Sequence, residues 1–398
     1  MAAAFQAQDG RAMKKTDRRV VVIVRETRLK AVLESQNTLS QARFYINSLG
    51  GDFGEYEKEH RQYNESVQIA RKNMEGLGKL QILDRKYLPN FIFAPDDVVV
   101  IIGQDGLVAN TLKYLDGQPV IGVNPDAGRW DGVLLPFLPG DLAKILKETM
   151  ADKRKVKEVT MAKASVQNGQ ELLAVNDFFI GQRTHVSARY VIKHGGVKEP
   201  QSSSGVIVST GLGSTGWMKS VIAGASRISA SVIGRPYGGQ QENEALMEKD
   251  DAVECMPMAA AAAPASFQGA PEETLCADSL APVPPVATVS AVADRSSFLR
   301  RRLLRQKKSY GISELSGVIG KWGSTELLFA VREPFPSKTT GTNLVFGKIS
   351  EDEPLRIESL MGENGVIFSD GMESDFIVFN SGAEAVITLA DKCGHIVV

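Results

Sequence analysis

The stretch Val98-Val99-Val100-Ile101-Ile102-Gly103-Gln104-Asp105-Gly106 decides the fold. A continuous run of β-branched apolar residues is typical of a strand that is buried on both faces of a sheet. Two glycines around an acid end this strand, and residues 107–115 have the pattern of a helix that follows at once. This order predicts a parallel α/β sheet, because the helix carries the chain back to begin the next strand in the same direction.

The flanking residues repeat the pattern. Two more buried strands are expected at residues 20–24 and 119–123, and two helices are expected at residues 52–73 and 141–155. Asp141 has the position and the side chain of a helix N-cap. We therefore expect an α/β nucleotide-binding domain over residues 19–155, preceded by a flexible N-terminus at 1–18.

After about residue 156 the pattern changes to short strands that are separated by turns, which indicates a β-rich second domain over residues 156–398. The expected strands are 158–165, 185–193, 205–210, 325–331, 343–349, 365–369, 375–380 and 385–389. One helix, at 214–228, interrupts them. The expected fold class is thus an N-terminal parallel α/β domain followed by a β-rich domain.

Residues 237–297 are rich in Ala, Pro, Ser and acidic side chains. Such a tract buries too little apolar surface to offset the entropy lost on ordering, so we expect a disordered insertion within the second domain. The helix expected at 298–308 carries several basic residues. A solvated helix face explains them more simply than a phosphate-binding role.

Composition excludes several classes of function. The 398 residues include 46 basic and 47 acidic side chains, so a nucleic-acid or membrane partner has no electrostatic basis. Cys255, Cys276 and Cys393 match neither a disulfide framework nor a metal motif, and no metal site is expected from them. His185, His194 and His395 are each interpreted as structural. Without a secretory signal or an apolar run of about 20 residues, a cytoplasmic protein is expected.

Asp105 is the first candidate for chemistry. The ends of parallel strands are where ligands bind, and glycines there let backbone N–H groups approach phosphate oxygens. A carboxylate among phosphates is costly unless it acts, for example by accepting a proton from an attacking hydroxyl. The purely structural alternative is that Asp105 is a helix N-cap in an ordinary turn. From these residues alone the cap is slightly favoured.

Two further segments carry polar side chains. Residues 205–216 contain a formal G-x-G-x-x-G, but no second buried strand with a terminal acid follows, so a Rossmann site is not expected. A loop that offers hydroxyls and N–H groups to a polar ligand is reasonable there. Asn176-Asp177 forms either a plain turn or a hydrogen-bonding pair for a base edge or ribose.

Taken in order, these pieces resemble the NAD kinase family, and most closely its mitochondrial type and the bacterial relatives of that type. The similarity covers the chain from about Arg19 to its end, without the insertion. The matching motifs are Gly103-Gln104-Asp105-Gly106 for Gly-Gly-Asp-Gly, Val123-Asn124, Asn176-Asp177, Gly213-Ser214-Thr215-Gly216-Trp217 for Gly-Ser-Thr-Ala-Tyr, and Phe368-Ser369-Asp370-Gly371.

The resemblance implies a second domain of β-sandwich type, an active site in the crevice between the domains, and a homodimer or higher homo-oligomer. Asp105 would accept the proton of the adenosine 2′-hydroxyl of NAD as that oxygen attacks a γ-phosphate, giving NADP. ATP or polyphosphate would be the donor, with Mg²⁺ bound through phosphates and water. The implied binding residues are Gly103, Gly106, Asn124, Asn176, Asp177, Thr215, Gly216 and Ser220.

The chain departs from the family at the turn itself. Gln104 replaces a glycine and Leu107 replaces a threonine that could contact the donor. Two alternatives therefore stay open. One is a kinase of another hydroxyl compound, such as a sugar or lipid. The other is a catalytically degenerate protein that binds a dinucleotide as a sensor.

Overall fold

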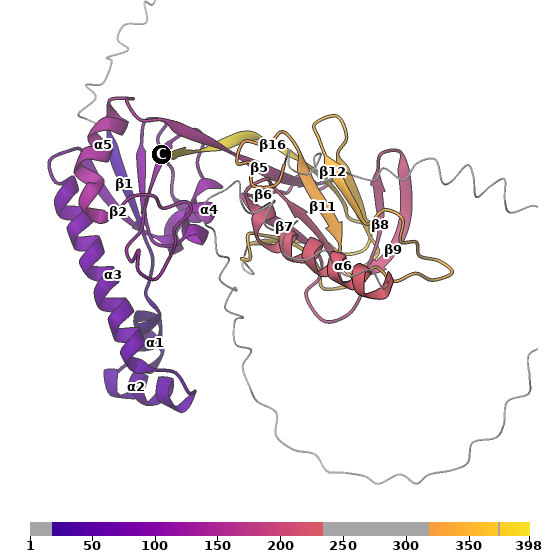
Figure 1. Ribbon diagram of the computed structural model, residues 1–398, viewed down its shortest axis with the longest axis horizontal. Coiled ribbons are helices and arrows are strands. Elements are labelled where there is room, and N and C mark those ends of the chain that lie inside the picture. Colours follow the sequence, from indigo (N-terminus) through magenta and orange to yellow (C-terminus); the bar gives the residue numbers. More distant parts are fainter. Residues whose placement is uncertain (1–17, 234–317, 373–374) are drawn as a thin grey trace, which may run out of the picture. The chain divides into compact units, whose positions relative to one another are not determined.

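The buried run Val98–Ile102 forms strand β3 of a parallel sheet, between β1 (Arg19–Val24) and β4 (Pro119–Val123), as expected. The computed structural model describes residues 18–233, 318–372 and 375–398 (Figure 1). The fourth strand of this parallel set is β2 (Lys79–Asp84), which pairs with the outer side of β1. The five α-helices of this half are α1 (Arg28–Gln36), α2 (Leu39–Ser48), α3 (Phe53–Met74), α4 (Asp105–Leu112) and α5 (Leu142–Met150), and two 3₁₀ helices lie at Arg85–Asn90 and Pro139–Asp141.

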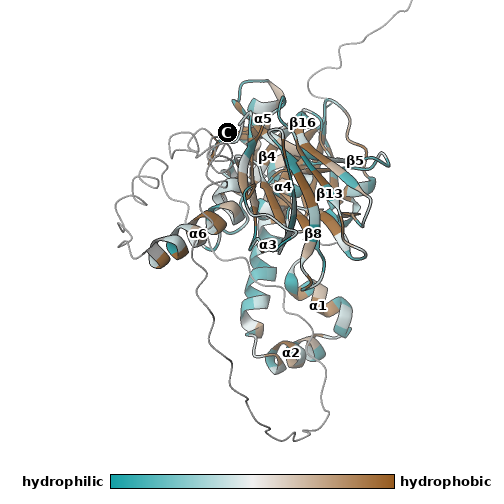
Figure 2. Ribbon diagram, turned by 90° about the vertical axis from the view of Figure 1, so that its right-hand side faces the viewer, coloured by the Kyte–Doolittle hydropathy of each residue, from teal (hydrophilic) through white to brown (hydrophobic). Residues whose placement is uncertain are grey.

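Alternation along the strands builds two layers of core. Val20, Val22, Val98 and Val100 pack against α3 and α5, whereas Val21, Ile23, Val99 and Ile101 pack against α4. Neighbouring residues of a strand point to opposite faces, so a continuous apolar run requires cover on both. In Figure 2 the strands carry most of the hydrophobic colour, whereas α3 is largely hydrophilic. The apolar runs of β1, β3 and β4 therefore give the clearest local signal in this half of the sequence.

A second sheet is antiparallel throughout and has the order β12-β11-β10-β7-β14-β15. Its strands are β7 (Asp177–Gln182), β10 (Val206–Ser209), β11 (Leu327–Val331), β12 (Phe346–Ile349), β14 (Gly365–Ser369) and β15 (Phe376–Val378). Their inner side chains share one core with strands of the first sheet, as Phe178 and Phe329 do with Tyr190 and Ile387. Two sheets that face one another across a common core form a β-sandwich.

The last strand joins the two halves. β16 (Glu384–Val397) pairs antiparallel with β5 (Val156–Val166) and β13 (Leu355–Ser359), and then parallel with β4 through His395 and Ile396. One sheet therefore continues from the parallel strands into the sandwich. Its remaining strands are β6 (Glu171–Ala174), β8 (Ala188–His194) and β9 (Val197–Ser203).

Some details differ from the expectations. The strand expected at 385–389 continues to Val397, because the polar residues around Asp391 interrupt its apolar alternation but not its pairing. Asp141 precedes α5, yet its carboxylate accepts the N–H of Leu138 rather than an N–H of that helix. The helix expected at 214–228 is α6 (Trp217–Ile233), which follows a short 3₁₀ turn at Gly213–Thr215.

Several expectations concern residues outside the described parts. These are most of the flexible N-terminus, the insertion at 237–297, the helix at 298–308, and Cys255 and Cys276. No helix of the described residues has both the length and the apolar character that crossing a bilayer requires.

Replacing Phe329 with Ala tests the shared sandwich core. Phe329 is fully buried among side chains of both sheets, so the cavity is expected to cost about 3–5 kcal/mol of unfolding free energy in denaturant titration. Phe44→Ala is the matched control, because Phe44 is 77% exposed on α2 and its loss should change stability by less than about 0.5 kcal/mol. Equal effects of the two changes would contradict the proposed core.

Candidate active site

Asp105 lies in the first turn of α4, directly after the Gly103-Gln104 turn that ends β3. The N-cap residue is Gln104, whose side chain makes no capping hydrogen bond. The Asp105 carboxylate turns away from the helix instead, and its Oδ1 accepts the N–H of Leu134 at 2.8 Å. The capping explanation for Asp105 is therefore wrong, because the carboxylate is held by the loop that follows β4.

The surroundings make this carboxylate more basic. Burial raises the pKa of Asp105 and the charge of Asp131 raises it further, while the N–H groups of Leu134 and Val133 oppose the shift. A pKa above the ordinary 3.8 of aspartate brings a carboxylate closer to the range in which it accepts protons efficiently. The backbone N–H bonds also fix its orientation.

Asn124 organises the loop that holds Asp105. Its Nδ2 donates to the Trp130 carbonyl at 2.7 Å, and its Oδ1 accepts the N–H of Asp126 at 3.0 Å. The side chain is buried, so its amide is already used within the loop. A Cβ on Gly122 would lie only 1.9 Å from the Leu134 carbonyl, which shows how closely this loop packs on β4. Asn124 thus positions the Leu134 N–H rather than facing a ligand.

The two glycines of the turn differ. A Cβ on Gly103 would lie 2.7 Å from Cδ2 of Leu107, so the protein's own side chain fills the space beside Gly103. Gly106 is exposed, and no described atom outside its immediate neighbours lies within 4 Å of where its Cβ would be. Of the two, Gly106 leaves room for a ligand to approach the helix N-terminus.

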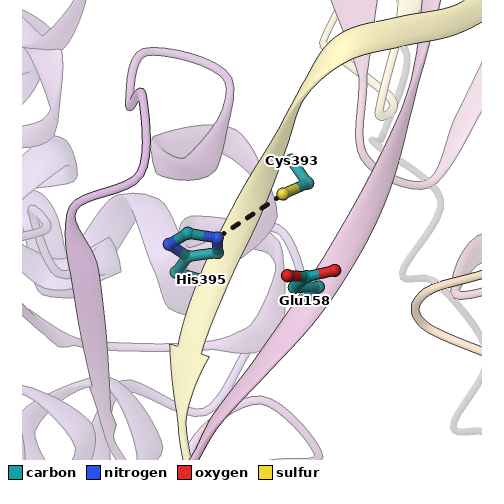
Figure 3. A group of neighbouring side chains, drawn as sticks. All are labelled: Glu158, Cys393 and His395. Carbon is teal, nitrogen blue, oxygen red and sulfur yellow. Dashed lines mark hydrogen bonds between the residues drawn. The ribbon is translucent and has the colours of Figure 1, made fainter.

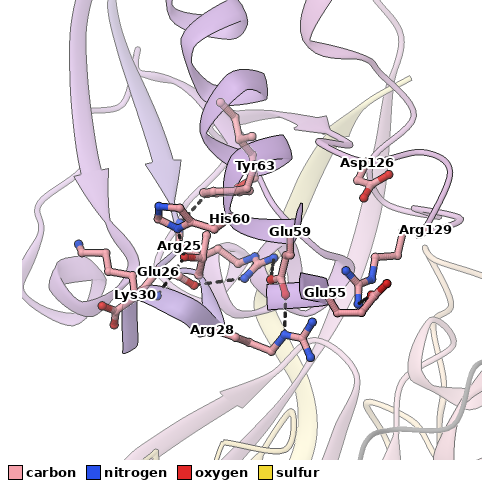
Figure 4. A network of polar contacts seen from close by, with 12 residues as sticks. Arg25, Glu26, Arg28, Lys30, Glu55, Glu59, His60, Tyr63, Asp126 and Arg129 are labelled. Atoms are coloured by element: carbon pink, nitrogen blue, oxygen red, sulfur yellow. Dashed lines mark hydrogen bonds and ion pairs between the residues drawn. The ribbon is translucent and has the colours of Figure 1, made fainter. Parts of the chain in front are cut away.

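A polar network at the same edge of the sheet was not identified from the sequence (Figure 4). Tyr63 of α3 donates to the carbonyl of Ile102 at 2.9 Å and accepts the N–H of Arg25, the residue after β1, at 2.8 Å. Burial alone would raise the pKa of Glu59, but hydrogen bonds from Arg25 and Arg28 lower it below its usual range. Tyr63 therefore joins the ends of the neighbouring strands β1 and β3, and the ion pairs of Glu59 with Arg25 and Arg28 lie beside it.

Asp370 holds the Asn176-Asp177 segment. Its carboxylate accepts the N–H groups of Val175, Asn176 and Asp177 at 3.1, 2.6 and 3.2 Å. The Nζ of Lys113, the residue after α4, lies 3.6 Å from Oδ2 of Asp370. The motif that resembles a family strand end in sequence is thus a backbone clamp, and it is linked to the helix that begins at Asp105.

Lys113 is buried, and it makes shorter contacts beside that clamp. Its Nζ donates to Oγ of Ser369 at 2.8 Å and forms an ion pair with Asp375 at 2.6 Å. A buried charge is tolerated only when it is paired and hydrogen-bonded, as it is here. The end of α4 is therefore fastened to the β14 turn.

Asp177 combines a buried carboxylate oxygen with a raised pKa. Its Oδ1 is buried and has no partner among the described residues. Burial raises the pKa of Asp177 to about 7, a hydrogen bond with Ser209 opposes this, and the charge of Asp370 adds to it. A buried polar atom without a partner is rare, so Oδ1 of Asp177 is a candidate contact for a polar ligand.

The Gly-rich loop packs on the same segment. A Cβ on Gly213 would lie 2.2 Å from the Asn176 carbonyl oxygen. Thr210 donates through Oγ1 to the Val175 carbonyl at 2.6 Å and accepts the N–H of Gly213 at 3.1 Å. The glycine spacing therefore reflects close backbone approach within the protein, which agrees with rejecting the Rossmann interpretation.

The remaining candidates line the surface beside this loop. Thr215, Gly216 and Ser220 are exposed. Thr215 Oγ1 donates to the Leu212 carbonyl at 3.1 Å, and Trp217 stacks on Phe179 with ring centroids 5.9 Å apart. Their hydroxyl and backbone groups are accessible to a ligand.

The candidates thus form two groups, one around Asp105 and one around Asp177. Within the described residues, no hydrogen bond or ion pair joins Asp105 to Asn176, Asp177 or Thr215. α4 connects the groups, because Asp105 lies in its first turn and Lys113, which follows its last residue, pairs with Asp370. The two ends of this helix lie about 12 Å apart at the usual helical rise. Leu107 of α4 also shares a core with Val175 and Leu212.

No family model and no curated protein matches the chain. Among solved structures, it is similar to an NAD kinase from Archaeoglobus fulgidus in complex with ATP, with 14% identity, a TM-score of 0.47, and coverage of 95% of this chain and 92% of the other. It is also similar to a yeast NADH kinase complexed with NADH, with 10% identity, a TM-score of 0.46, and coverage of 96% and 84%. At these values neither structure assigns an activity to the chain.

Asp177→Asn tests the unusual environment of Asp177. With a pKa of about 7 in the folded state against an ordinary 3.8, Asp177 keeps a proton on folding that it loses when unfolded. Its contribution to stability is therefore complete below about pH 4 and is lost as pH rises through about 7. The asparagine variant should lose less unfolding free energy than wild type over this interval.

The matched control is Asp391→Asn, whose exposed carboxylate has a pKa lowered by its hydrogen bond to Lys163 and is already ionised across the interval. Its pH dependence should follow wild type. Denaturant titrations at several pH values that show the same slope for Asp177→Asn and wild type would contradict the assignment.

Proposed function

We propose that this protein is a kinase that transfers a γ-phosphate to the adenosine 2′-hydroxyl of NAD, giving NADP. The observation that carries the proposal is the Asp105 carboxylate, held by the Leu134 N–H at the end of β3 and not used as a helix cap. The choice of NAD as the acceptor rests on the order of the family-like motifs in the sequence, because an acid at the end of a strand is by itself compatible with many hydroxyl substrates.

Asp105 acts as the general base. Its Oδ1 is held by the N–H of Leu134, and we assign acceptance of the 2′-hydroxyl proton to Oδ2. As the proton moves to Asp105, the 2′-oxygen forms a bond to the γ-phosphorus and the bond to the β,γ-bridging oxygen breaks. Burial, which raises the pKa of Asp105, assists the proton transfer.

The second group of candidates binds the acceptor. The unpartnered Oδ1 of Asp177 and the side chain of Asn176 offer hydrogen bonds to the nucleoside part of NAD. The exposed Thr215, Gly216 and Ser220 line the dinucleotide beside them. Phosphates approach the N-terminus of α4 over Gly106, where backbone N–H groups favour negative charge, whereas Leu107 fills the space beside Gly103. Asn124 contributes by holding the loop around Asp105 in place.

Magnesium fits the oxygen donors at this edge. Asp131 is exposed and its charge raises the pKa of Asp105, so a second carboxylate acts on the region in which the proposal places the nucleotide's phosphates. Mg²⁺ prefers such oxygen ligands completed by phosphates and water, and it would neutralise charge on the donor. ATP or polyphosphate supplies the transferred group.

One observation favours a second candidate, a sensor that binds a dinucleotide without catalysis. Leu107 fills the space beside Gly103, where the resemblance places a threonine that could contact the donor. An apolar side chain at that point removes a hydroxyl and narrows the approach of phosphate. Substrate binding without turnover would be the outcome.

An assay with NAD, ATP and Mg²⁺, read by an NADP-specific dehydrogenase, separates these candidates. Wild type should form NADP, and Asp105→Asn should reduce turnover by at least about 100-fold, the low end for a lost general base. NAD affinity measured by calorimetry should change little, because Asp105 belongs to the group around the reacting hydroxyl. Parallel reactions with polyphosphate identify the donor.

Asp391→Asn is the matched control and should retain the wild-type rate, since this carboxylate is exposed on β16. Wild-type turnover in Asp105→Asn would remove Asp105 from the mechanism. NAD binding without product would support the sensor, and no NAD binding would contradict both dinucleotide candidates.

A further inference from the structure

Three potential metal ligands meet on the first sheet, away from the candidates above. Cys393 and His395 of β16 lie beside Glu158 of β5 (Figure 3), and their ligand atoms all lie within 4.8 Å of one another. The sequence offered no metal motif there, because the third residue is distant along the chain. Strand pairing alone brings the three together.

The strand register explains the grouping. His395 is directly opposite Glu158, and Cys393 is opposite Thr160, in the antiparallel pairing of β16 with β5. Residues two apart in a strand share a face, so Cys393 and His395 point to the same side, and a directly opposed residue such as Glu158 shares that side too. All three ligand positions are thus set by backbone pairing rather than by a loop.

The imidazole of His395 is oriented as a metal ligand. Its Nδ1 lies 2.9 Å from the Gly117 carbonyl oxygen, which can only accept, so Nδ1 carries the hydrogen and donates it. Nε2 then carries a lone pair, which faces Sγ of Cys393 at 3.5 Å. Metal-binding histidines usually donate their second N–H to a carbonyl or carboxylate in this way.

The spacing fits zinc. With Zn–S and Zn–N bonds of about 2.3 and 2.0–2.1 Å, tetrahedral geometry separates sulfur and nitrogen by about 3.5 Å. That is the distance between Sγ of Cys393 and Nε2 of His395. A thiolate and the Glu158 carboxylate together supply two negative charges, which a divalent cation neutralises. Cysteine, histidine and glutamate are all common zinc ligands.

We infer that Glu158, Cys393 and His395 form a binding site for a thiophilic divalent cation of the Zn²⁺ class, with water completing a tetrahedron. The pairing of β16 shifts register between Leu389 and Cys393, close to where the strand begins to pair with β4. A cation here fastens β16 to β5 and, through His395 and Gly117, to the turn before β4. The site stabilises the strand that both halves of the fold share.

Cobalt is the probe, because a thiolate bound to Co²⁺ gives a charge-transfer absorption band. The full chain should first carry Cys255→Ser and Cys276→Ser, which leave Cys393 as its one cysteine. This variant should bind one Co²⁺ per chain with that band, and Zn²⁺ should displace the Co²⁺. Its unfolding temperature should rise with Zn²⁺, since a ligand that binds the folded state stabilises it.

Further changes test each ligand in the same background. Cys393→Ser should abolish the band, and His395→Gln, which can still donate to Gly117, should weaken Co²⁺ binding by at least about 10-fold. Glu158→Gln should weaken it as well, whereas Glu171→Gln, an exposed acid on neighbouring β6, is the matched control and should not.

Absence of a thiolate band in the background variant would overturn the site. Co²⁺ binding that His395→Gln and Glu158→Gln leave unchanged would also overturn it, because the cation would then be held elsewhere. Failure of Cys393→Ser to fold would not affect the test, since the glutamine variants keep the thiol.

Discussion

The candidate site depends on one buried carboxylate, that of Asp370. It accepts three consecutive backbone N–H groups, from Val175 to Asp177, while Lys113 approaches it from the end of α4. Carboxylates satisfied by several N–H groups are strongly fixed in orientation. This contact sets the course of the Asn176-Asp177 segment, and it also fastens the helix whose first turn carries Asp105. Asp370 itself adopts a positive φ of 53°, a strain that a tight turn at the end of β14 accounts for.

Close approach of backbone to backbone explains Gly122 and Gly213 better than close approach to a ligand does. Gly122 admits the loop that brings Leu134 to Asp105, and Gly213 admits the Asn176 carbonyl. Each glycine acts on the site indirectly, by letting a neighbouring segment lie where its polar groups are needed. A glycine pattern that resembles a dinucleotide motif can thus arise from packing, and the chemistry resides in the side chains that such packing orients.

The sequence predicted three of the four parallel strands, α4 and a β-rich second half, because buried strands carry a local apolar signal; it missed the half-exposed β2. It also predicted that Asp105 lies at a strand end. It could not show that the carboxylate is held by Leu134, whose N–H comes from 29 positions further along the chain. The cap alternative failed for the same reason. The pairing of β16 with β4 could not be predicted either, because Asp391 and its neighbours interrupt the alternation of apolar and polar residues along the strand.

The polar clusters were missed for a related cause. Arg25 and Glu59 belong to no recognisable motif in their own segments. Their ion pair forms only because α3 lies beside the end of β1 in the folded chain. Cys393 and His395 looked isolated until the register placed Glu158 opposite. Sites built from residues far apart in sequence need the fold before their spacing can be judged.

The pH dependence of kcat/KM for NAD phosphorylation tests most directly whether Asp105 is the base. Because burial raises the pKa of Asp105 above 3.8, we expect kcat/KM to fall on acidification with an apparent pKa above that value. The residual activity of Asp105→Asn should lack this acidic limb, even though Asp177 can still titrate. An acidic limb that persists unchanged in Asp105→Asn would contradict the assignment, as would a wild-type rate that does not vary down to about pH 4.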